Sequence, residues 1–444
     1  RKDVFDALKA LKVPVMRWPG GCFADDYHWM DGVGPQKDRA YISNNNWGGT
    51  LEDNSFGTHE FLNLCEMLGI EPYISGNVGS GSVEEMSDWV EYMTSDAKST
   101  MADLRRENGR EKPWKVKYFG IGNEAWGCGG NMTPEYYSDL FRRYGTYLRD
   151  FSGNKLYKIA SGASDYDYNW TEVLMNKLTG KGMRGVSLHY YTVIDWNDKG
   201  SALKFTDKDY YNILSKSIEI EGVLKKHIDI MDEIDPKNTV DLLLDEWGTW
   251  YNVEPGTNPG HLYQQNTMRD AIVAALNFDI FHKYTRRLKM ANIAQVVNVL
   301  QAMILTNDTQ MVLTPTYHVF EMYNVHQNAE YLSSDIITSK QTCDRAIAVP
   351  EVDVTASRKD GNMNISLVNT DLKKSKKVLV SFDDAKAISK VVSARVLTSK
   401  DVRDYNDFEK PQVVSPVAFK DYKFTKAGLE VTLPPCSVVA ISAN

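Results

Sequence analysis

Short apolar runs alternate with amphipathic stretches along the first three quarters of the chain. The apolar runs are rich in Val, Ile and Leu, which is typical of strands that helices cover on both faces of a parallel sheet. In the stretches between them, apolar residues recur at helical spacing, and one stretch opens with Thr133 and Pro134, a pair typical of a helix start. The predicted strands are 13–18, 71–75, 116–121, 157–161, 185–190, 240–244 and 293–299. The predicted helices include 57–68, 134–151 and 269–284.

The chain begins within an amphipathic helix. Residues 1–12 carry their apolar side chains on one helical face, and the first predicted strand follows at once. A helix that leads directly into a strand indicates that an upstream segment is absent from this chain. The seven strands therefore predict a (β/α)8 TIM barrel whose first strand is missing. A doubly wound sheet is the alternative, but it would need a phosphate-binding loop near the start, and the sequence has none there.

The pattern changes after residue 328. Helical spacing fades, and segments with a period of two residues follow one another to the end of the chain. This pattern predicts an all-β sandwich of jelly-roll type that packs against the barrel. We therefore expect a catalytic barrel over residues 1–328 and a sandwich over residues 329–444. The predicted sandwich strands are 364–368, 377–382, 391–397, 429–433 and 437–441.

Composition narrows the range of partners. The 444 residues include 51 basic and 59 acidic side chains, for a net charge of -8, and no polybasic block. This argues against nucleic acids and anionic membranes, and no apolar run reaches the roughly 20 residues of a membrane helix. Five cysteines are too few and too scattered for a disulfide framework. The 10 Trp and 24 Tyr residues suit sugar rings, although such residues also fill protein cores.

The candidate chemistry lies where the predicted strands end, because a parallel barrel carries its active site at that edge. Two of these ends supply a glutamate, Glu124 and Glu246. A pair of carboxyl groups is the minimum for cleaving a glycosidic bond, with one as acid and the other as nucleophile or base. Asp245 competes with Glu246, but neighbours on a strand point to opposite faces, so only one of the two should face the barrel interior.

Other chemistries find less support in the sequence. Residues 120–125 superficially fit a dinucleotide-binding fingerprint, but the next helix starts only near Pro134. The eight His residues form no HExxH motif or ligand-spaced cluster, and neither GxSxG nor a P-loop is present. We therefore expect no metal and no cofactor. A nucleophilic cysteine, Cys22 or Cys128, paired with His189 is a weaker alternative.

Four long segments together resemble glycoside hydrolase family 51, the α-L-arabinofuranosidases. They are MRWPGGCFADDYHWMDGVGP (16–35), FGIGNEAWGCGGNMTPEYYSDLFRRY (119–144), LLLDEWGTWY (242–251) and ANIAQVVNVLQAMI (291–304). The resemblance implies a (β/α)8 barrel with a C-terminal sandwich, and hydrolysis of arabinofuranosides with retention of configuration. It also implies that Glu124 is the acid/base and Glu246 the nucleophile, after the fourth and seventh strands of the complete barrel. The absent first strand would supply a further sugar-binding glutamate.

The resemblance extends to the residues around the two glutamates. Asn123 would bind the sugar 2-hydroxyl, and Arg17 would lie beneath Glu246 and keep it ionised. We count His189 as a candidate substrate contact, and Tyr190 stays open as an alternative to Tyr191. Four tryptophans in loops near strand ends are either core packing or sugar platforms: Trp47, Trp126, Trp247 and Trp250. The other implied contacts are Cys22, Tyr191 and Gln295 to the sugar, and Trp47 and Trp126 to the aglycone.

The resemblance names a substrate class without choosing its polymer. Arabinan, arabinoxylan and their oligosaccharides all carry terminal arabinofuranose, and family members are often hexamers. The compartment stays open between cytoplasm and periplasm or secretion, because a signal peptide would lie upstream of Arg1. Two other functions compete: another retaining glycosidase of the same clan, such as a xylosidase or endoglucanase, and a non-catalytic carbohydrate-binding barrel.

Overall fold

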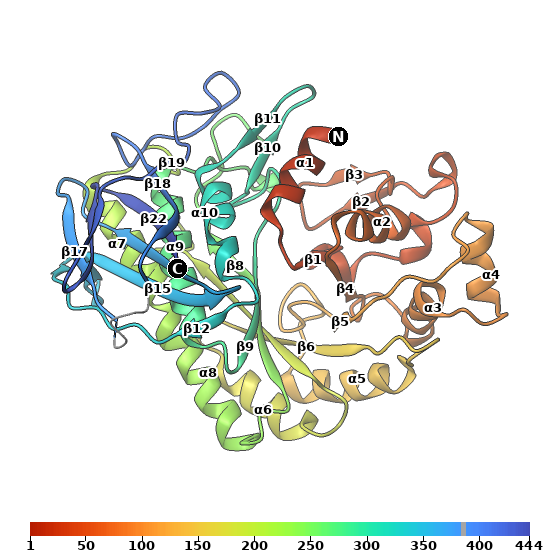
Figure 1. The fold of residues 1–444 in the computed structure, drawn as a ribbon. Coiled ribbons are helices and arrows are strands. Elements are labelled where there is room, and N and C mark those ends of the chain that lie inside the picture. Colours follow the sequence, from red (N-terminus) through yellow and green to blue (C-terminus); the bar gives the residue numbers. More distant parts are fainter. Residues whose placement is uncertain (383–387) are drawn as a thin grey trace.

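A computed structural model describes residues 1–382 and 388–444 of the chain. Its centre is a sheet of seven strands that lie side by side in chain order, and every neighbouring pair is parallel (Figure 1). The strands are β1 (Val15–Trp18), β4 (Glu71–Gly76), β5 (Tyr118–Ile121), β6 (Tyr157–Ser164), β7 (Gly185–Thr192), β8 (Asp241–Thr249) and β9 (Leu288–Ile293).

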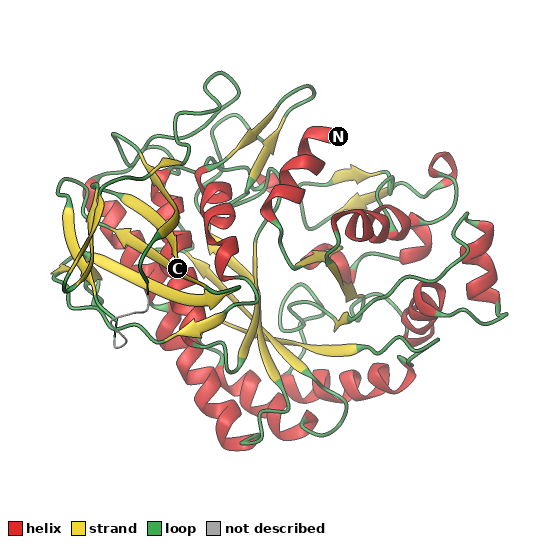
Figure 2. Cartoon of the chain, viewed as in Figure 1, coloured by secondary structure: helices red, strands yellow, loops and turns green. Residues whose placement is uncertain are grey.

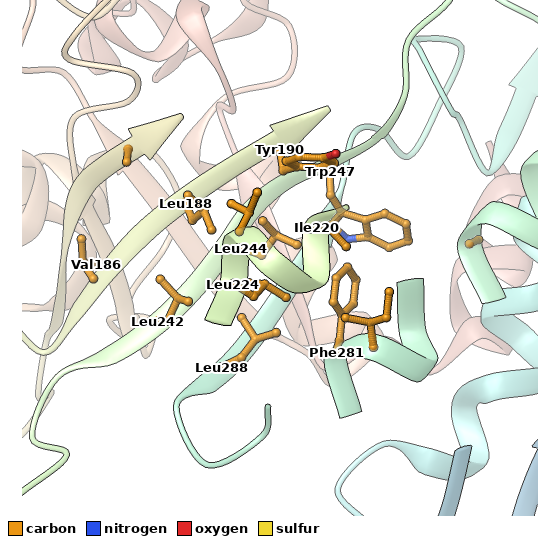
Figure 3. Packing of buried hydrophobic residues seen from close by; sticks show 14 of the residues in the cluster. Val186, Leu188, Tyr190, Ile220, Leu224, Leu242, Leu244, Trp247, Phe281 and Leu288 are labelled. Carbon is orange, nitrogen blue, oxygen red and sulfur yellow. The ribbon is translucent and has the colours of Figure 1, made fainter. Parts of the chain in front are cut away.

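Helices connect these strands and cover the outer face of the sheet, as Figure 2 shows. One of them begins at Pro134, where Thr133 caps it by accepting a hydrogen bond from the Tyr136 amide. The helices of this part are α1 (Lys2–Leu11), α2 (Thr58–Leu68), α3 (Val83–Thr94), α4 (Thr100–Glu107), α5 (Pro134–Tyr147), α6 (Tyr168–Leu178), α7 (Asp207–Ile218), α8 (Ile220–Ile234), α9 (Met268–Lys283) and α10 (Pro315–Tyr323). Apolar side chains such as Val186, Leu242 and Leu288 fill the space between strands and helices (Figure 3). Among the described residues, no helix has both the length and the apolar character needed to cross a membrane.

The sheet does not close into a complete barrel. Its two edges are β1 and β9, and no described strand lies between them. A cavity of about 1500 Å³ extends from the carboxyl ends of the strands along this gap and is lined by residues of both edges, including Met16, Met290 and Ile293. The predicted TIM-like architecture is confirmed, as a parallel sheet of seven described strands that is open between β1 and β9.

The last strand of the sheet lies five residues earlier than predicted. We expected a strand at 293–299, but β9 spans Leu288–Ile293. Lys289 is exposed between the buried Leu288 and Met290, and Asn292 is polar, so β9 is not a continuous apolar run. The segment that follows it is more apolar and therefore matches the pattern expected of a buried parallel strand.

The C-terminal part is a two-sheet β-structure. One sheet has the order β12 (Glu330–Leu332), β15 (Val352–Lys359), β16 (Asn362–Asn369), β22 (Ser437–Ala443), β18 (Val391–Thr398) and β19 (Val417–Ala418). The other has the order β17 (Lys376–Val380), β21 (Gly428–Leu433) and β20 (Tyr422–Thr425). Side chains such as Leu367 and Val431 form the core between them. The sequence analysis missed β15, which pairs with β16 along its whole length.

The sandwich packs directly on the barrel. Val368, Leu397 and Val438 belong to the same buried cluster as the barrel helices, and Arg395 forms an ion pair with Glu321 of α10. We propose that the division between the two parts lies near residue 328, because β12 begins just after it. Three small hairpins complete the fold: β2 (Ile42–Asn44) with β3 (Thr50–Glu52), β10 (Ile304–Thr306) with β11 (Met311–Leu313), and β13 (Lys340–Gln341) with β14 (Val349–Pro350).

Candidate active site

Both predicted glutamates lie at the carboxyl ends of the central strands. Glu124 follows β5, and Glu246 lies near the end of β8. One carboxylate oxygen of each glutamate and one ring nitrogen of His189 all lie within 4.8 Å of one another. These two carboxylate oxygens are thus closer together than the roughly 6.5–9.5 Å that inverting glycosidases keep between their carboxyl groups to admit a water molecule.

A β-bulge brings a second carboxylate to the nucleophile's side of the strand. Along the β7–β8 pair, Leu188 lies opposite Leu244 but His189 lies opposite Glu246, so Asp245 is an extra residue. Asp245 and Glu246 consequently both reach the barrel interior, where each contacts Arg17. The expectation that strand alternation would admit only one of them is wrong, because the bulge interrupts that alternation.

Arg17 of β1 connects three side chains of the site. Its Nη1 donates to Glu246 Oε1 at 3.0 Å, its Nη2 donates to Asn123 Oδ1 at 2.6 Å, and its Nε lies 3.7 Å from Asp245 Oδ2. Burial by itself would raise the pKa of Glu246, but the His189 ring, the Arg17 guanidinium and a hydrogen bond from Tyr191 lower it below its usual value. Glu246 is therefore held in the ionised form that a nucleophile requires.

The structure distinguishes between the two candidate tyrosines. Tyr191 donates a hydrogen bond from its hydroxyl to Glu246 Oε2 at 2.6 Å. Tyr190 points to the other face of β7, where its hydroxyl donates to the Lys216 carbonyl at 2.7 Å. Tyr191 is thus the tyrosine of the site, and the edge of its ring meets Trp250 with the ring centres 5.0 Å apart.

His189 lies between the two glutamates. Its Nδ1 is 2.8 Å from Glu124 Oε1 and 3.5 Å from Glu246 Oε2. Burial opposes a charge on the ring, but the two carboxylates outweigh it and raise the pKa of His189 above its usual value. In this position His189 orients the side chain of Glu124, and in its protonated form it places positive charge beside Glu246.

Asn123 has one half of its amide engaged and the other half free. Its Oδ1 accepts from Arg17, whereas its Nδ2 is buried and has no partner among the described residues. A buried amide nitrogen without a partner is costly unless a ligand completes it. The side chain is therefore suited to donate a hydrogen bond to a hydroxyl of a bound sugar, which is the role that the resemblance implies.

Cys22 and Cys128 form a disulfide beside the candidate acid/base. Their sulfurs lie 3.8 Å and 3.4 Å from Glu124 Oε2. The sequence analysis expected no disulfide and considered a cysteine nucleophile, and the disulfide corrects both expectations because neither sulfur is a thiol. The two residues are 106 positions apart, and only the fold brings the loop after β1 against the loop after β5. Cys22 can therefore meet a sugar only through its backbone or the disulfide.

This disulfide should contribute measurably to stability. In the chain-entropy treatment, a bridge that closes a loop of about 100 residues stabilises by about 4.7 kcal/mol. We expect Cys128→Ser to lower the urea concentration at the midpoint of unfolding, and a dithiol reductant to do the same to the unmodified protein. Cys343→Ser, which removes a free cysteine, is the matched control and should leave the midpoint unchanged. Equal midpoints for Cys128→Ser and the parent protein would contradict a stabilising bridge.

The predicted aromatic residues occupy different environments. Trp47 lines the same cavity as Arg17 and Glu246. Trp126 packs against the barrel core and donates from its indole nitrogen to the Gly162 carbonyl at 3.1 Å. Gln295 follows β9 and lines the cavity.

Trp247 is not a sugar platform. It is fully buried on the outer face of β8 and packs against Phe278, Phe281 and Phe320 (Figure 3). The bulge at Asp245 explains this placement, because Glu246 turns to the interior and the next residue then turns outward. This corrects its inclusion among the candidate substrate contacts.

One residue of the site was not predicted. Tyr73 of β4 lies beneath the glutamates and donates from its hydroxyl to Asp245 Oδ2 at 2.6 Å. It carries no motif signal, because it lies within the apolar strand and not at its carboxyl end. Trp250, four residues after Glu246 and one of the four tryptophans considered as sugar platforms, lines the cavity.

Glu124, His189 and Glu246 are close enough to hold a metal ion. Glu246, however, already accepts from the Arg17 guanidinium and the Tyr191 hydroxyl, and a cation would compete with the positive charge of Arg17. A fixed guanidinium with two hydrogen-bonded carboxylates instead suits covalent and acid–base chemistry. An open parallel barrel with this pair at the ends of β5 and β8 defines a glycoside hydrolase of the two-carboxylate type.

Comparison with known proteins specifies the family. A family model described as "Alpha-L-arabinofuranosidase 1 domain" matches residues 7–207, and one described as "Alpha-L-arabinofuranosidase C-terminal domain" matches residues 245–437. The chain is 61% identical over 443 residues to a Bacteroides ovatus protein named "Intracellular exo-alpha-L-arabinofuranosidase", covering 99% of this chain and 86% of that protein. The chain belongs to the α-L-arabinofuranosidases of glycoside hydrolase family 51.

Solved structures agree with this assignment. The GH51 arabinofuranosidase from Xanthomonas axonopodis pv. citri is 48% identical and superimposes with a TM-score of 0.97 over 100% of this chain and 90% of that chain. The α-L-arabinofuranosidase from Thermotoga maritima, solved as an arabinose complex, is 28% identical with a TM-score of 0.83 and the same coverage.

Proposed function

We propose that this chain is an exo-acting α-L-arabinofuranosidase that releases terminal arabinofuranose by double displacement, with retention of configuration. The activity follows from family membership and from the name of the Bacteroides ovatus relative. The separation of the two glutamates, with one oxygen of each within 4.8 Å of the other, supports the retaining mechanism. The substrate is a glycan that carries arabinofuranose.

In the first step, we assign the attack to Glu246. Its ionised carboxylate attacks the anomeric carbon, while Glu124 donates a proton to the departing glycosidic oxygen, so that a covalent glycosyl-enzyme forms. Arg17 and Tyr191 orient Glu246 through the hydrogen bonds described above, and Asn123 Nδ2 is placed to bind a sugar hydroxyl whose hydrogen bond strengthens in the transition state.

In the second step, Glu124 works in the opposite direction. It takes a proton from a water molecule as the water attacks the anomeric carbon, and the bond to Glu246 breaks. The contact between His189 Nδ1 and Glu124 Oε1 supports this double role, because it holds the carboxyl group in one place while its protonation changes. Two inversions at the anomeric carbon then leave the configuration unchanged.

The stereochemistry of the product tests this mechanism. When the enzyme cleaves 4-nitrophenyl α-L-arabinofuranoside, proton NMR should detect α-arabinofuranose as the first anomer, before mutarotation. If β-arabinofuranose formed first, the retaining mechanism would be wrong, although the activity itself would stand. If the enzyme did not cleave aryl α-L-arabinofuranosides but rapidly cleaved the matching aryl β-D-xyloside, this result would instead favour a xylosidase of the same clan.

The polymer and the assembly are finer questions. Arabinan and arabinoxylan oligosaccharides both present terminal arabinofuranose, and we propose both as substrates. The homo-oligomer, a hexamer by resemblance to the family, stays a prediction that light scattering can test.

A further inference from the structure

A buried carboxylate next to the site has no role in the reaction described above. Asp25 lies in the 3₁₀ turn η1 (Cys22–Asp25), directly after β1, and is only 3% exposed. Its Oδ1 accepts hydrogen bonds from the amides of Val78 at 2.8 Å and Gly79 at 3.0 Å. Its Oδ2 accepts from the amide of Asn123 at 3.0 Å. One side chain thus joins the loops that follow β1, β4 and β5.

The hydrogen bond to Asn123 fixes the peptide between Gly122 and Asn123, one residue before Glu124. Glu124 has a positive φ of 42°, which a non-glycine residue keeps only when its surroundings hold it there. On its far side, the amide of Ala125 donates to Ser161 Oγ at 3.1 Å. The backbone of Glu124 is therefore held from both directions, by Asp25 before it and by Ser161 after it.

The backbone packs closely around Asp25. A Cβ at Gly129 would lie 1.9 Å from the Asn123 carbonyl oxygen and 2.9 Å from Asp25 Oδ2. A Cβ at Gly79 would lie 2.9 Å from Asp25 Cβ. The chain thus approaches the carboxylate closely at two glycines, and a larger residue at either position would displace these loops.

We infer that Asp25 is a positioning residue for the acid/base: its carboxylate holds the Asn123 peptide and thereby directs the Glu124 side chain toward the glycosidic oxygen. This inference rests on the proposed function. The Cys22–Cys128 disulfide joins the same two loops independently. Removing the carboxylate therefore alters the direction of Glu124 while the loops stay attached.

The chemistry of the leaving group separates this role from a purely structural one. Departure of a sugar alkoxide needs the proton of Glu124, whereas departure of 2,4-dinitrophenolate does not. A misdirected acid should therefore slow the cleavage of arabinobiose far more than that of a dinitrophenyl glycoside. Azide attacks the glycosyl-enzyme without a general base. It should therefore restore part of the rate that the second step loses in such a variant.

Asp25→Asn is the variant of choice, because it keeps the shape and one oxygen. That oxygen remains at the Val78 and Gly79 amides, where two donors meet it, so the new NH2 group faces the Asn123 amide and the bond to Asn123 is lost. We expect kcat/KM for arabinobiose to fall by about 10- to 100-fold, a part of the full general-acid contribution, and that for 2,4-dinitrophenyl α-L-arabinofuranoside to fall by less than about 3-fold. Azide should accelerate turnover of the dinitrophenyl substrate by the variant, as it should for Glu124→Ala.

Asp235→Asn is the matched control. Asp235 is also a buried carboxylate that accepts two amide hydrogen bonds, from Thr239 at 2.7 Å and Val240 at 2.9 Å, together with one from Arg287 Nη1 at 3.0 Å, but it lies before β8 at the opposite end of the barrel. In Asp235→Asn, kcat/KM should change by the same factor for both substrates, and azide should not accelerate turnover.

An equal loss on both substrates for Asp25→Asn, without rescue by azide, would overturn the inference. If Asp25→Asn does not fold, Asp25→Glu takes its place, because it moves both oxygens by one methylene. The test is then the same ratio between the losses of kcat/KM for arabinobiose and for the dinitrophenyl substrate. Failure of the proposed function would look different, because the unmodified enzyme would then cleave neither arabinofuranoside.

Discussion

Glu246→Gln should reduce kcat for aryl α-L-arabinofuranosides by about 10⁴-fold or more, as is usual when a nucleophile is removed. Glutamine keeps the size of the side chain but cannot form the glycosyl-enzyme. Among the described residues, only Asp245 offers another carboxylate in contact with Arg17. The measurement is the release of 4-nitrophenolate under saturating substrate, with folding of the variant checked by circular dichroism.

Asp245→Asn tests which of the two neighbouring carboxylates attacks. Asp245 lies on the same strand and contacts the same Arg17, but its Oδ2 is engaged by the Tyr73 hydroxyl. We expect this variant to keep measurable turnover. If instead Asp245→Asn were inactive and Glu246→Gln active, the assignment of the nucleophile would be reversed.

Arg17→Met should shift the acid limb of the kcat/KM profile to higher pH. The nucleophile must be ionised, and Arg17 contributes to a pKa of Glu246 that lies below its usual value. Without the guanidinium, burial and the nearby Asp245 favour the protonated form, so activity is lost at a higher pH than in the parent enzyme. Because an ionised Glu246 stabilises the fold only above its folded-state pKa, the same variant should also lose stability near neutral pH.

The stability loss for Arg17→Met should be about 3–5 kcal/mol, the usual effect of removing one partner of a buried ion pair. Urea unfolding at pH 7 measures it. Arg17→Lys keeps the charge without the planar fork that reaches Glu246 and Asn123 together. Its acid limb should stay near that of the parent enzyme while kcat/KM falls. Identical acid limbs for Arg17→Met and the parent enzyme would rule out electrostatic control of Glu246 by Arg17.

These predictions concern a site built from separate strands. Arg17 comes from β1, Glu124 follows β5, His189 and Tyr191 belong to β7, and Glu246 belongs to β8. Because all these strands are parallel and end at one edge, residues more than 200 positions apart come within hydrogen-bond distance. This arrangement explains why motif order along the chain was enough to assign the two glutamates.

Periodicity was less reliable at irregular places. The edge strand β9 was placed five residues too late, because its alternating exposure does not form a continuous apolar run. The bulge in β8 placed Asp245 in the interior and Trp247 in the core. No single-residue pattern announces a bulge, since it depends on how two neighbouring strands are paired.

The sequence by itself determined the strand–helix alternation, the sandwich that follows and the family, and it selected Glu124 and Glu246 as the candidate catalytic pair. These features follow from local hydrophobic periodicity and from long ordered motifs. The tertiary structure alone decided that Tyr191 rather than Tyr190 meets Glu246, that Cys22 and Cys128 are joined, and that Asp25 holds the amide of Asn123. Each of these depends on contacts between strands or loops that are distant in sequence, and only the packed barrel brings them together.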